Sequence, residues 1–134
     1  MSYLALFDDE EFISHAGLKL GWKIEMDALY TDDWLCLAKM IMEYENRPFR
    51  KAVGIPRGGV RLGEMLNKHS TGNPDDPVLI VDDVYTTGTS FKEFIAENYP
   101  NDNVICWTVF ARDVISGNIN ALFQMPSSMR PKLK

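Results

Sequence analysis

The stretch Val78–Ser90, with the sequence VLIVDDVYTTGTS, constrains the fold of this chain more than any other. Its first four residues are apolar, and three of them are β-branched. Such a run is too short for a typical helix and predicts a buried strand of a parallel sheet. Asp82 and Asp83 follow at the carboxyl end of this strand, and a turn then leads into a helix start at Phe91–Ile95.

The turn is built from small hydroxylated residues around one glycine: Thr86, Thr87, Gly88, Thr89 and Ser90. Hydroxyls and the N–H groups of a helix N-terminus donate hydrogen bonds to a phosphate, and the helix dipole favours its negative charge. The two carboxylates accept hydrogen bonds from ribose hydroxyls, so the stretch suits a sugar phosphate. The rival Walker A loop is absent from the chain. The alternative that Asp and Thr only cap a helix stays open.

Length and composition predict one cytoplasmic domain. A chain of 134 residues buries a sizeable core, and 46% hydrophobic with 25% charged residues is ordinary for a globular protein. The net charge of −5 argues against binding to a nucleic-acid backbone. No apolar run reaches membrane-spanning length and the N-terminus has no basic leader, so we expect no membrane contact.

The two cysteines predict no disulfide and no zinc site. Cys36 and Cys106 are far apart in the chain, lie among apolar residues and have no ligand spacing. We therefore expect two buried free thiols.

Hydrophobic spacing predicts the elements before the central stretch. The acidic cluster before Phe12 predicts a short helix, and the alternation from Leu18 to Met26 predicts a strand with one buried face. An N-cap at Thr31 and apolar residues at helical spacing predict a helix from Asp32 to about Glu45.

Strands and helices alternate through the remaining chain. We expect strands over 51–55, 104–110 and 119–125, helices from Val60 and over 89–98, and an exposed loop over 68–77. The alternation predicts an α/β fold, namely a three-layer α/β/α domain with a mostly parallel central sheet.

A second loop with ligand-binding character stands between the strand at 51–55 and its helix. It reads Pro56-Arg57-Gly58-Gly59. The glycine pair allows close approach of a ligand to the backbone, and Arg57 suits an anion. A tight turn alone explains such a pair, but a parallel βαβ arrangement brings this loop and the Thr86–Ser90 turn to one sheet edge, where α/β folds bind ligands.

Both loops resemble those of one enzyme family. VLIVDDVYTTGTS resembles the signature with which type I phosphoribosyltransferases bind 5-phosphoribosyl 1-diphosphate (PRPP), and GIPRGG resembles their diphosphate loop. The resemblance implies that Asp82 and Asp83 are catalytic, face the ribose hydroxyls and lie near Mg²⁺, which is held through PRPP or water. It also implies that Thr86–Ser90 binds the 5′-phosphate and that Arg57, Gly58 and Gly59 bind the diphosphate.

The first third of the chain resembles the orotate branch of this family. Phe12–Leu29 is similar to the segment that covers the base in that branch. The sequence FARD at 110–113 is similar to the Asp-Arg pair that contacts the base there. The resemblance implies base contacts from Arg112 and His15, a hood formed by about residues 1–30 with the C-terminal tail, a single domain over 1–134, and a homodimer.

The sequence departs from that branch at its mobile catalytic loop. Between Leu66 and Val78 there is room for a turn, and Lys68 is the one lysine. Thr86 replaces the aspartate of purine-type members. We expect a Mg²⁺-dependent phosphoribosyltransferase that joins a pyrimidine-type nucleobase to PRPP or runs the reverse cleavage of the nucleoside monophosphate. Because the mobile loop is missing, we expect this enzyme to be slow. The alternative is a non-catalytic regulatory module that binds PRPP or a nucleotide.

Overall fold

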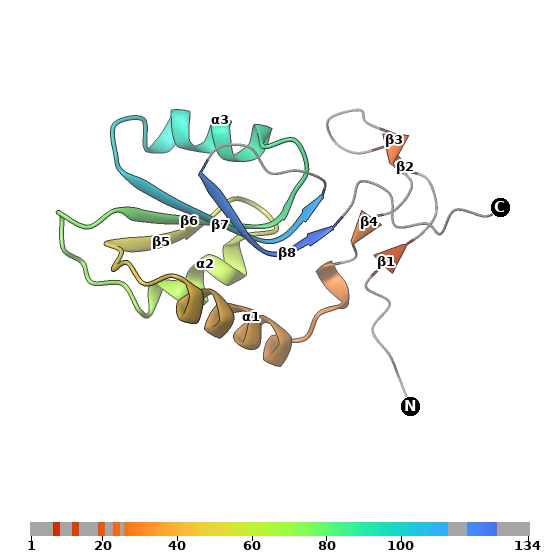
Figure 1. The fold of residues 1–134 in the computed structure, drawn as a ribbon, viewed down its shortest axis with the longest axis horizontal. Helices are drawn as coiled ribbons and strands as arrows, with labels where there is room; N and C mark the ends of the chain where they lie inside the picture. Colours follow the sequence, from red (N-terminus) through yellow and green to blue (C-terminus); the bar gives the residue numbers. More distant parts are fainter. Residues whose placement is uncertain are drawn as a thin grey trace.

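The computed structural model describes residues 26–112 and 118–125, together with the backbone of four two-residue strands nearer the N-terminus. These four are β1 (Phe7–Asp8), β2 (Phe12–Ile13), β3 (Lys19–Leu20) and β4 (Lys23–Ile24). The other elements are η1 (Met26–Ala28), α1 (Thr31–Tyr44), β5 (Lys51–Gly54), α2 (Val60–Asn67), β6 (Val78–Tyr85), α3 (Thr89–Asn98), β7 (Val104–Arg112) and β8 (Ile119–Met125) (Figure 1).

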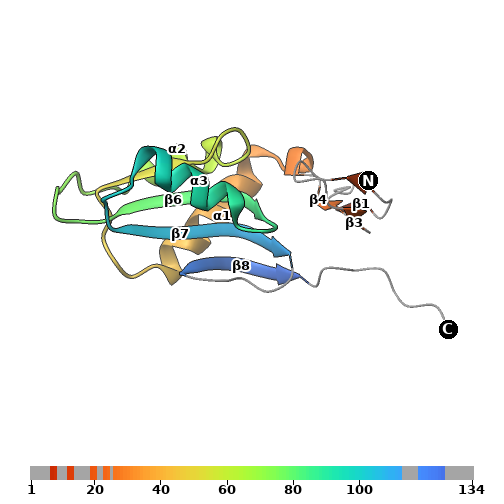
Figure 2. The same cartoon turned by 90° about the horizontal axis from the view of Figure 1, so that it is seen from above.

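The central sheet has four strands in the order β5-β6-β7-β8, and each pair of neighbouring strands in it is parallel. Gly54 pairs with Val81, and Arg112 pairs with Met125. The parallel sheet and the α/β fold predicted from the sequence are confirmed, and β8 spans the predicted residues 119–125. Figure 2 shows β6, β7 and β8 pointing the same way, with β1 and β4 beyond the end at their arrowheads.

Helices cover both faces of this sheet, as a three-layer fold requires (Figure 1). One buried cluster joins α1 and α2 to one face, and the other joins α3 to the opposite face. Within β6, Leu79 and Val81 belong to the first cluster, whereas Val78 and Ile80 belong to the second. A strand covered on both sides needs apolar residues at every position, which explains the unbroken run in the sequence.

Two predictions for the N-terminal part are wrong. The stretch around Leu18–Met26 is not one strand, because β3 pairs with β2, β4 pairs with β1, and η1 begins at Met26. The alternation in this stretch is thus divided between two small antiparallel sheets. The described residues directly after the acidic cluster do not form the predicted short helix either, since Phe12–Ile13 is the strand β2.

Three further details differ from the sequence-based expectation. Helix α1 begins at Thr31, so Tyr30 is the N-cap, and its N–H donates to the Asp33 carboxylate at 2.8 Å. Strand β6 continues through the acidic pair to Tyr85, because β7 pairs with it that far. Cys36 is exposed and only Cys106 is buried, although both thiols are free as expected.

The connection from α2 to β6 is short, as predicted. It consists of residues 68–77, contains no helix or strand, and is mostly exposed. The described part of the chain thus leaves no room at this position for an additional strand and a long lid. Among the described helices, none is long and apolar enough to cross a membrane.

A carboxylate at the end of α1 ties this helix to the sheet. Glu45 is 9% exposed and accepts hydrogen bonds from Nε1 of Trp107 at 2.8 Å and from Nε of Arg47 at 3.0 Å. Burial raises the pKa of Glu45, but the hydrogen bonds from Arg47 and Trp107 outweigh it, so the pKa lies below its ordinary value. The negative charge of Glu45 is therefore favoured in the folded state.

We expect Glu45→Ala to lower the free energy of unfolding by about 2 kcal/mol, because it leaves the buried Trp107 N–H without its acceptor. The matched variant Arg47→Ala should cost about 1 kcal/mol or less, since the Arg47 side chain is 61% exposed. Urea denaturation at pH 7 measures both. Equal losses in the two variants would contradict a structural role for the Glu45–Trp107 bond.

Candidate functional site

The loop after β5 and the turn after β6 both lie at the carboxyl edge of the parallel sheet, which confirms the expectation that they share this edge. The Ile55 N–H donates to the Val81 carbonyl at 2.9 Å, so the loop stays attached to β6 as it leaves the sheet. The Gly59 N–H then donates back to the Ile55 carbonyl at 2.9 Å, and α2 begins one residue later. The Pro56–Arg57 peptide bond within the loop is cis.

Close backbone packing explains why this loop contains glycine. A Cβ added to Gly54 would lie 1.8 Å from the Gly59 carbonyl oxygen. A Cβ on Gly58 would lie 2.2 Å from Oδ2 of Asp83. The loop and the acidic pair therefore touch, through the backbone of Gly58 and the carboxylate of Asp83.

The two carboxylates of β6 differ in their surroundings. Asp82 is 7% exposed and its Oδ1 accepts the Asp83 N–H at 2.8 Å. Asp83 is half-buried, and its Oδ1 accepts the Val84 N–H at 2.7 Å. Burial, followed by repulsion from Asp83, raises the pKa of Asp82 to about 8. The folded state therefore favours the protonated form of Asp82, and the Asp83 carboxylate borders the loop at Gly58.

The turn between β6 and α3 presents hydroxyls at the start of a helix. Gly88 has φ +85°, and a Cβ there would lie 2.8 Å from the hydroxyl oxygen of Tyr85, so both conformation and space demand glycine. The hydroxyls of Thr87 and Thr89 lie 2.9 Å apart, and both residues are exposed. The Lys92 N–H donates to the Gly88 carbonyl and so closes the first turn of α3. The N–H groups of the preceding helical residues have no partner in the helix itself and suit an anion.

The basic residues predicted for this site fall into different surroundings. Arg57 is exposed in the loop. Arg112, at the end of β7, is 4% exposed, and burial lowers its pKa. Its neighbour Ala111 pairs with Tyr85 of β6, which places Arg112 at the same sheet edge as the acidic pair. His15 lies outside the described residues.

The described residues contain no group of three or more His, Cys, Asp or Glu side chains that could hold a metal ion. The acidic pair offers two carboxyl groups, and burial raises the pKa of one of them, Asp82. Mg²⁺ is commonly bound through one or two carboxylates together with substrate phosphates and water. The pair therefore fits a Mg²⁺ ion that arrives with a phosphorylated ligand, and fits poorly an ion held by the protein alone.

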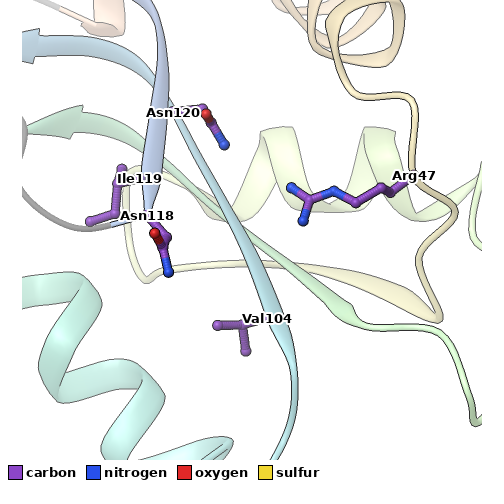
Figure 3. Close-up of a pocket in the computed structure, with 5 residues that line it drawn as sticks. All are labelled: Arg47, Val104, Asn118, Ile119 and Asn120. Atoms are coloured by element: carbon purple, nitrogen blue, oxygen red, sulfur yellow. The ribbon is translucent and has the colours of Figure 1, made fainter.

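A polar hollow that the sequence did not predict lies at the opposite, amino end of β7 and β8. Figure 3 shows the Arg47 guanidinium on one side of this hollow and Asn118 and Asn120 on the other, and its volume is about 340 Å³. Glu45 already forms an ion pair with Arg47, so the charge of Arg47 is compensated.

Glu45 and Trp107 are distant in sequence, and no local pattern indicates that they meet.

The fold is that of known phosphoribosyltransferases. The chain has a TM-score of 0.71 and 19% identity to orotate phosphoribosyltransferase from Aeropyrum pernix, covering 90% of this chain and 89% of that one. For UMP synthase from Leishmania donovani the TM-score is 0.74 at 15% identity, covering 90% of this chain and 34% of that one. For orotate phosphoribosyltransferase from Mycobacterium tuberculosis it is 0.62 at 14% identity, covering 85% and 86%.

Comparisons of the sequence alone give a different result. No protein-family model matches it, and no curated protein matches it. At identities this low, the structural likeness establishes the arrangement of strands and helices. The chain therefore has a type I phosphoribosyltransferase-like fold.

Proposed function

We propose that this protein is a Mg²⁺-dependent phosphoribosyltransferase that transfers ribose 5-phosphate between PRPP and a nucleobase, preferably a pyrimidine of the orotate kind. The observation that carries the proposal is the contact of Gly58 with Asp83. It brings a glycine loop suited to a diphosphate against a carboxylate suited to ribose hydroxyls. PRPP is a molecule in which these two groups are directly joined.

Each part of the site has a role in this proposal. The carboxylate of Asp83 accepts hydrogen bonds from the ribose hydroxyls, and Asp82, whose Oδ1 accepts the Asp83 N–H, lies next to it. The Thr86–Ser90 turn holds the 5′-phosphate by its hydroxyls and by the N–H groups at the start of α3. The backbone of Gly58 and Gly59 and the exposed Arg57 contact the diphosphate.

In the proposed reaction the bond from ribose C1 to the diphosphate oxygen breaks, and a bond from C1 to a ring nitrogen of the base forms. The ribose gains positive character on the way, and the leaving diphosphate gains negative charge. Mg²⁺ bound with PRPP supplies charge neutralisation on that diphosphate. Arg57 is the described cation of the diphosphate loop, and it stabilises the same charge.

Of the two residues proposed to contact the base, the structure describes one, Arg112. Arg112 is buried at the end of β7, and a guanidinium in such a place suits a carboxylate or carbonyl of a pyrimidine. His15 is proposed as a second contact. We therefore expect Arg112→Gln to raise KM for the base more than KM for PRPP, as measured in steady-state assays with each substrate varied in turn.

A second candidate function is a non-catalytic module that binds PRPP or a nucleotide. The short 68–77 connection favours it, since it contains one lysine and no lid. The absence of one cationic contact to the leaving group raises the barrier by about 2–4 kcal/mol, which slows a reaction a hundredfold or more. We therefore favour a slow enzyme over an inert binder.

Turnover separates these two functions. We expect protein, Mg²⁺ and PRPP to release diphosphate when orotate or another pyrimidine is added, and Asp83→Asn to reduce this release about a hundredfold through lost ribose orientation. Asp75→Asn, an exposed carboxylate in the 68–77 loop, is the matched control and should leave the rate unchanged. PRPP binding without release of diphosphate across a panel of bases would support the binding module instead.

A further inference from the structure

The connection between β7 and β8 is short for two parallel neighbouring strands. The two strands are parallel neighbours, yet only residues 113–118 link them. Parallel strands are usually joined by a dozen or more residues, most often with a helix that covers the sheet. Among the residues that the structure describes, α3 is the one helix on this face, and it packs mainly against β6.

A cavity of about 350 Å³ lies beside α3 at this position. Its apolar lining comes from α3 and from the first residues of β7 and β8: Phe91, Ile95, Val104, Cys106 and Ile119. Burial raises the pKa of the Cys106 thiol to about 11, so the thiol is neutral and adds to the apolar surface. The volume lies within the range of about 300–1,000 Å³ that is usual for small-molecule sites.

The polar groups of this cavity are few, and most of them belong to α3 and the turn before it. Lys92 lines it, as do Thr87 and Thr89 of the turn that starts the helix, and Asn118 lines it from the side of β8. Among the described residues, none forms an ion pair with Lys92. Arg47 is different, because Glu45 compensates its charge in the neighbouring hollow of Figure 3. The exposed Lys92 therefore gives the edge of this cavity a positive charge that no described carboxylate pairs with.

We propose that this cavity is a second binding site, for a small molecule with an apolar body and one anionic group. The apolar body lies against Phe91, Ile95 and Ile119. The anionic group lies near the ammonium of Lys92 and the hydroxyls of Thr87 and Thr89, where the N-terminal end of the α3 dipole adds to the attraction. An apolar pocket with a few polar groups to orient its ligand is the usual form of such a site.

A ligand in this cavity also affects the PRPP site, a consequence that rests on the proposed function. The hydroxyls of Thr87 and Thr89 belong to the turn assigned to the 5′-phosphate. An anion at Lys92 competes for these hydroxyls, so the two ligands weaken each other's binding by the same factor. An apolar anion in the cavity would thus inhibit phosphoribosyl transfer.

Fluorescence titration with anilinonaphthalene sulfonate (ANS), an aromatic molecule with one anionic group, tests the site. We expect one ANS molecule per native chain, and Lys92→Gln should raise its Kd about fivefold to tenfold, by loss of the cation. Lys39→Gln, on the exposed face of α1, should leave the Kd unchanged. Ile119→Trp should abolish binding by filling the cavity, with circular dichroism used to verify the fold of each variant.

The outcomes separate this inference from the proposed function. Lack of ANS binding to the native chain, or an equal effect of Lys92→Gln and Lys39→Gln, would overturn the cavity site whatever the enzyme does. If ANS binds as expected, ribose 5-phosphate should raise its Kd several-fold. ANS binding that ribose 5-phosphate leaves unchanged would overturn the coupling, while the cavity site would stand.

Discussion

Gly54→Ala is expected to destabilise the domain by about 3 kcal/mol or more, which is a large part of the stability of a chain this size. The added methyl group would lie 1.8 Å from the Gly59 carbonyl oxygen and 2.7 Å from the Val60 nitrogen. Both of these atoms are backbone atoms, fixed by the hydrogen bonds that lead from the loop into α2. No side-chain rotation relieves the contact, so β5 and the loop must separate.

Gly72→Ala is the matched control for this prediction. Gly72 has φ +70°, but nothing lies within 4 Å of a Cβ at this position. The substitution should therefore cost only about 1 kcal/mol, from the left-handed backbone alone. Urea unfolding of the two variants measures the difference. Equal losses would show that the loop packs against the strand less closely than the structure has it.

Asp82→Asn is expected to stabilise the protein at pH 8, even though it damages the proposed ribose site. The pKa of Asp82 is raised to about 8 from an ordinary 3.8, chiefly by burial. The unfolded chain loses this proton near pH 4, whereas the folded chain keeps it until about pH 8. The contribution of Asp82 to stability is therefore full below pH 4 and is lost as the pH rises toward 8.

The pH dependence of the difference between variant and wild type measures this effect. Between pH 5 and 8, we expect Asp82→Asn to gain on the wild type by up to about 1.4 kcal/mol per pH unit, since the neutral amide has no proton to lose. Asp75→Asn, at an exposed loop position, should run parallel to the wild type over this range. A difference between Asp82→Asn and wild type that does not change with pH would mean that Asp82 is ionised in the folded protein.

The local sequence pattern predicted β6 because this strand lies between two helical layers. The run at Val78–Val81 is apolar at every position, since alternate residues face α2 and α3. The pattern stops at Asp82, but the strand continues to Tyr85 because hydrogen bonding to β7 does not depend on side-chain polarity. The site residues were predicted for a similar reason: a strand end and a helix start together determine where the turn lies.

Features that depend on contacts distant in sequence were not predictable in this way. Cys36 has Leu35 and Leu37 beside it, yet the buried stripe of α1 runs through Trp34, Ala38 and Ile41, and Cys36 lies off it. The alternation near the N-terminus shows a strand tendency, but it does not show that β3 and β4 pair with different strands. Likewise, only the folded chain brings Glu45 to Trp107 and opens a cavity beside α3.

The most direct test of the central claim is a nuclear magnetic resonance titration of labelled protein with ribose 5-phosphate. The claim is that the turn between β6 and α3 holds the phosphate of a pentose. We expect the largest amide shifts at Thr86–Ser90, with smaller shifts at Asp83, and none at Asn118 or Asn120 at the opposite end of the sheet. No shifts at all, or shifts confined to the amino end of β7 and β8, would contradict the claim.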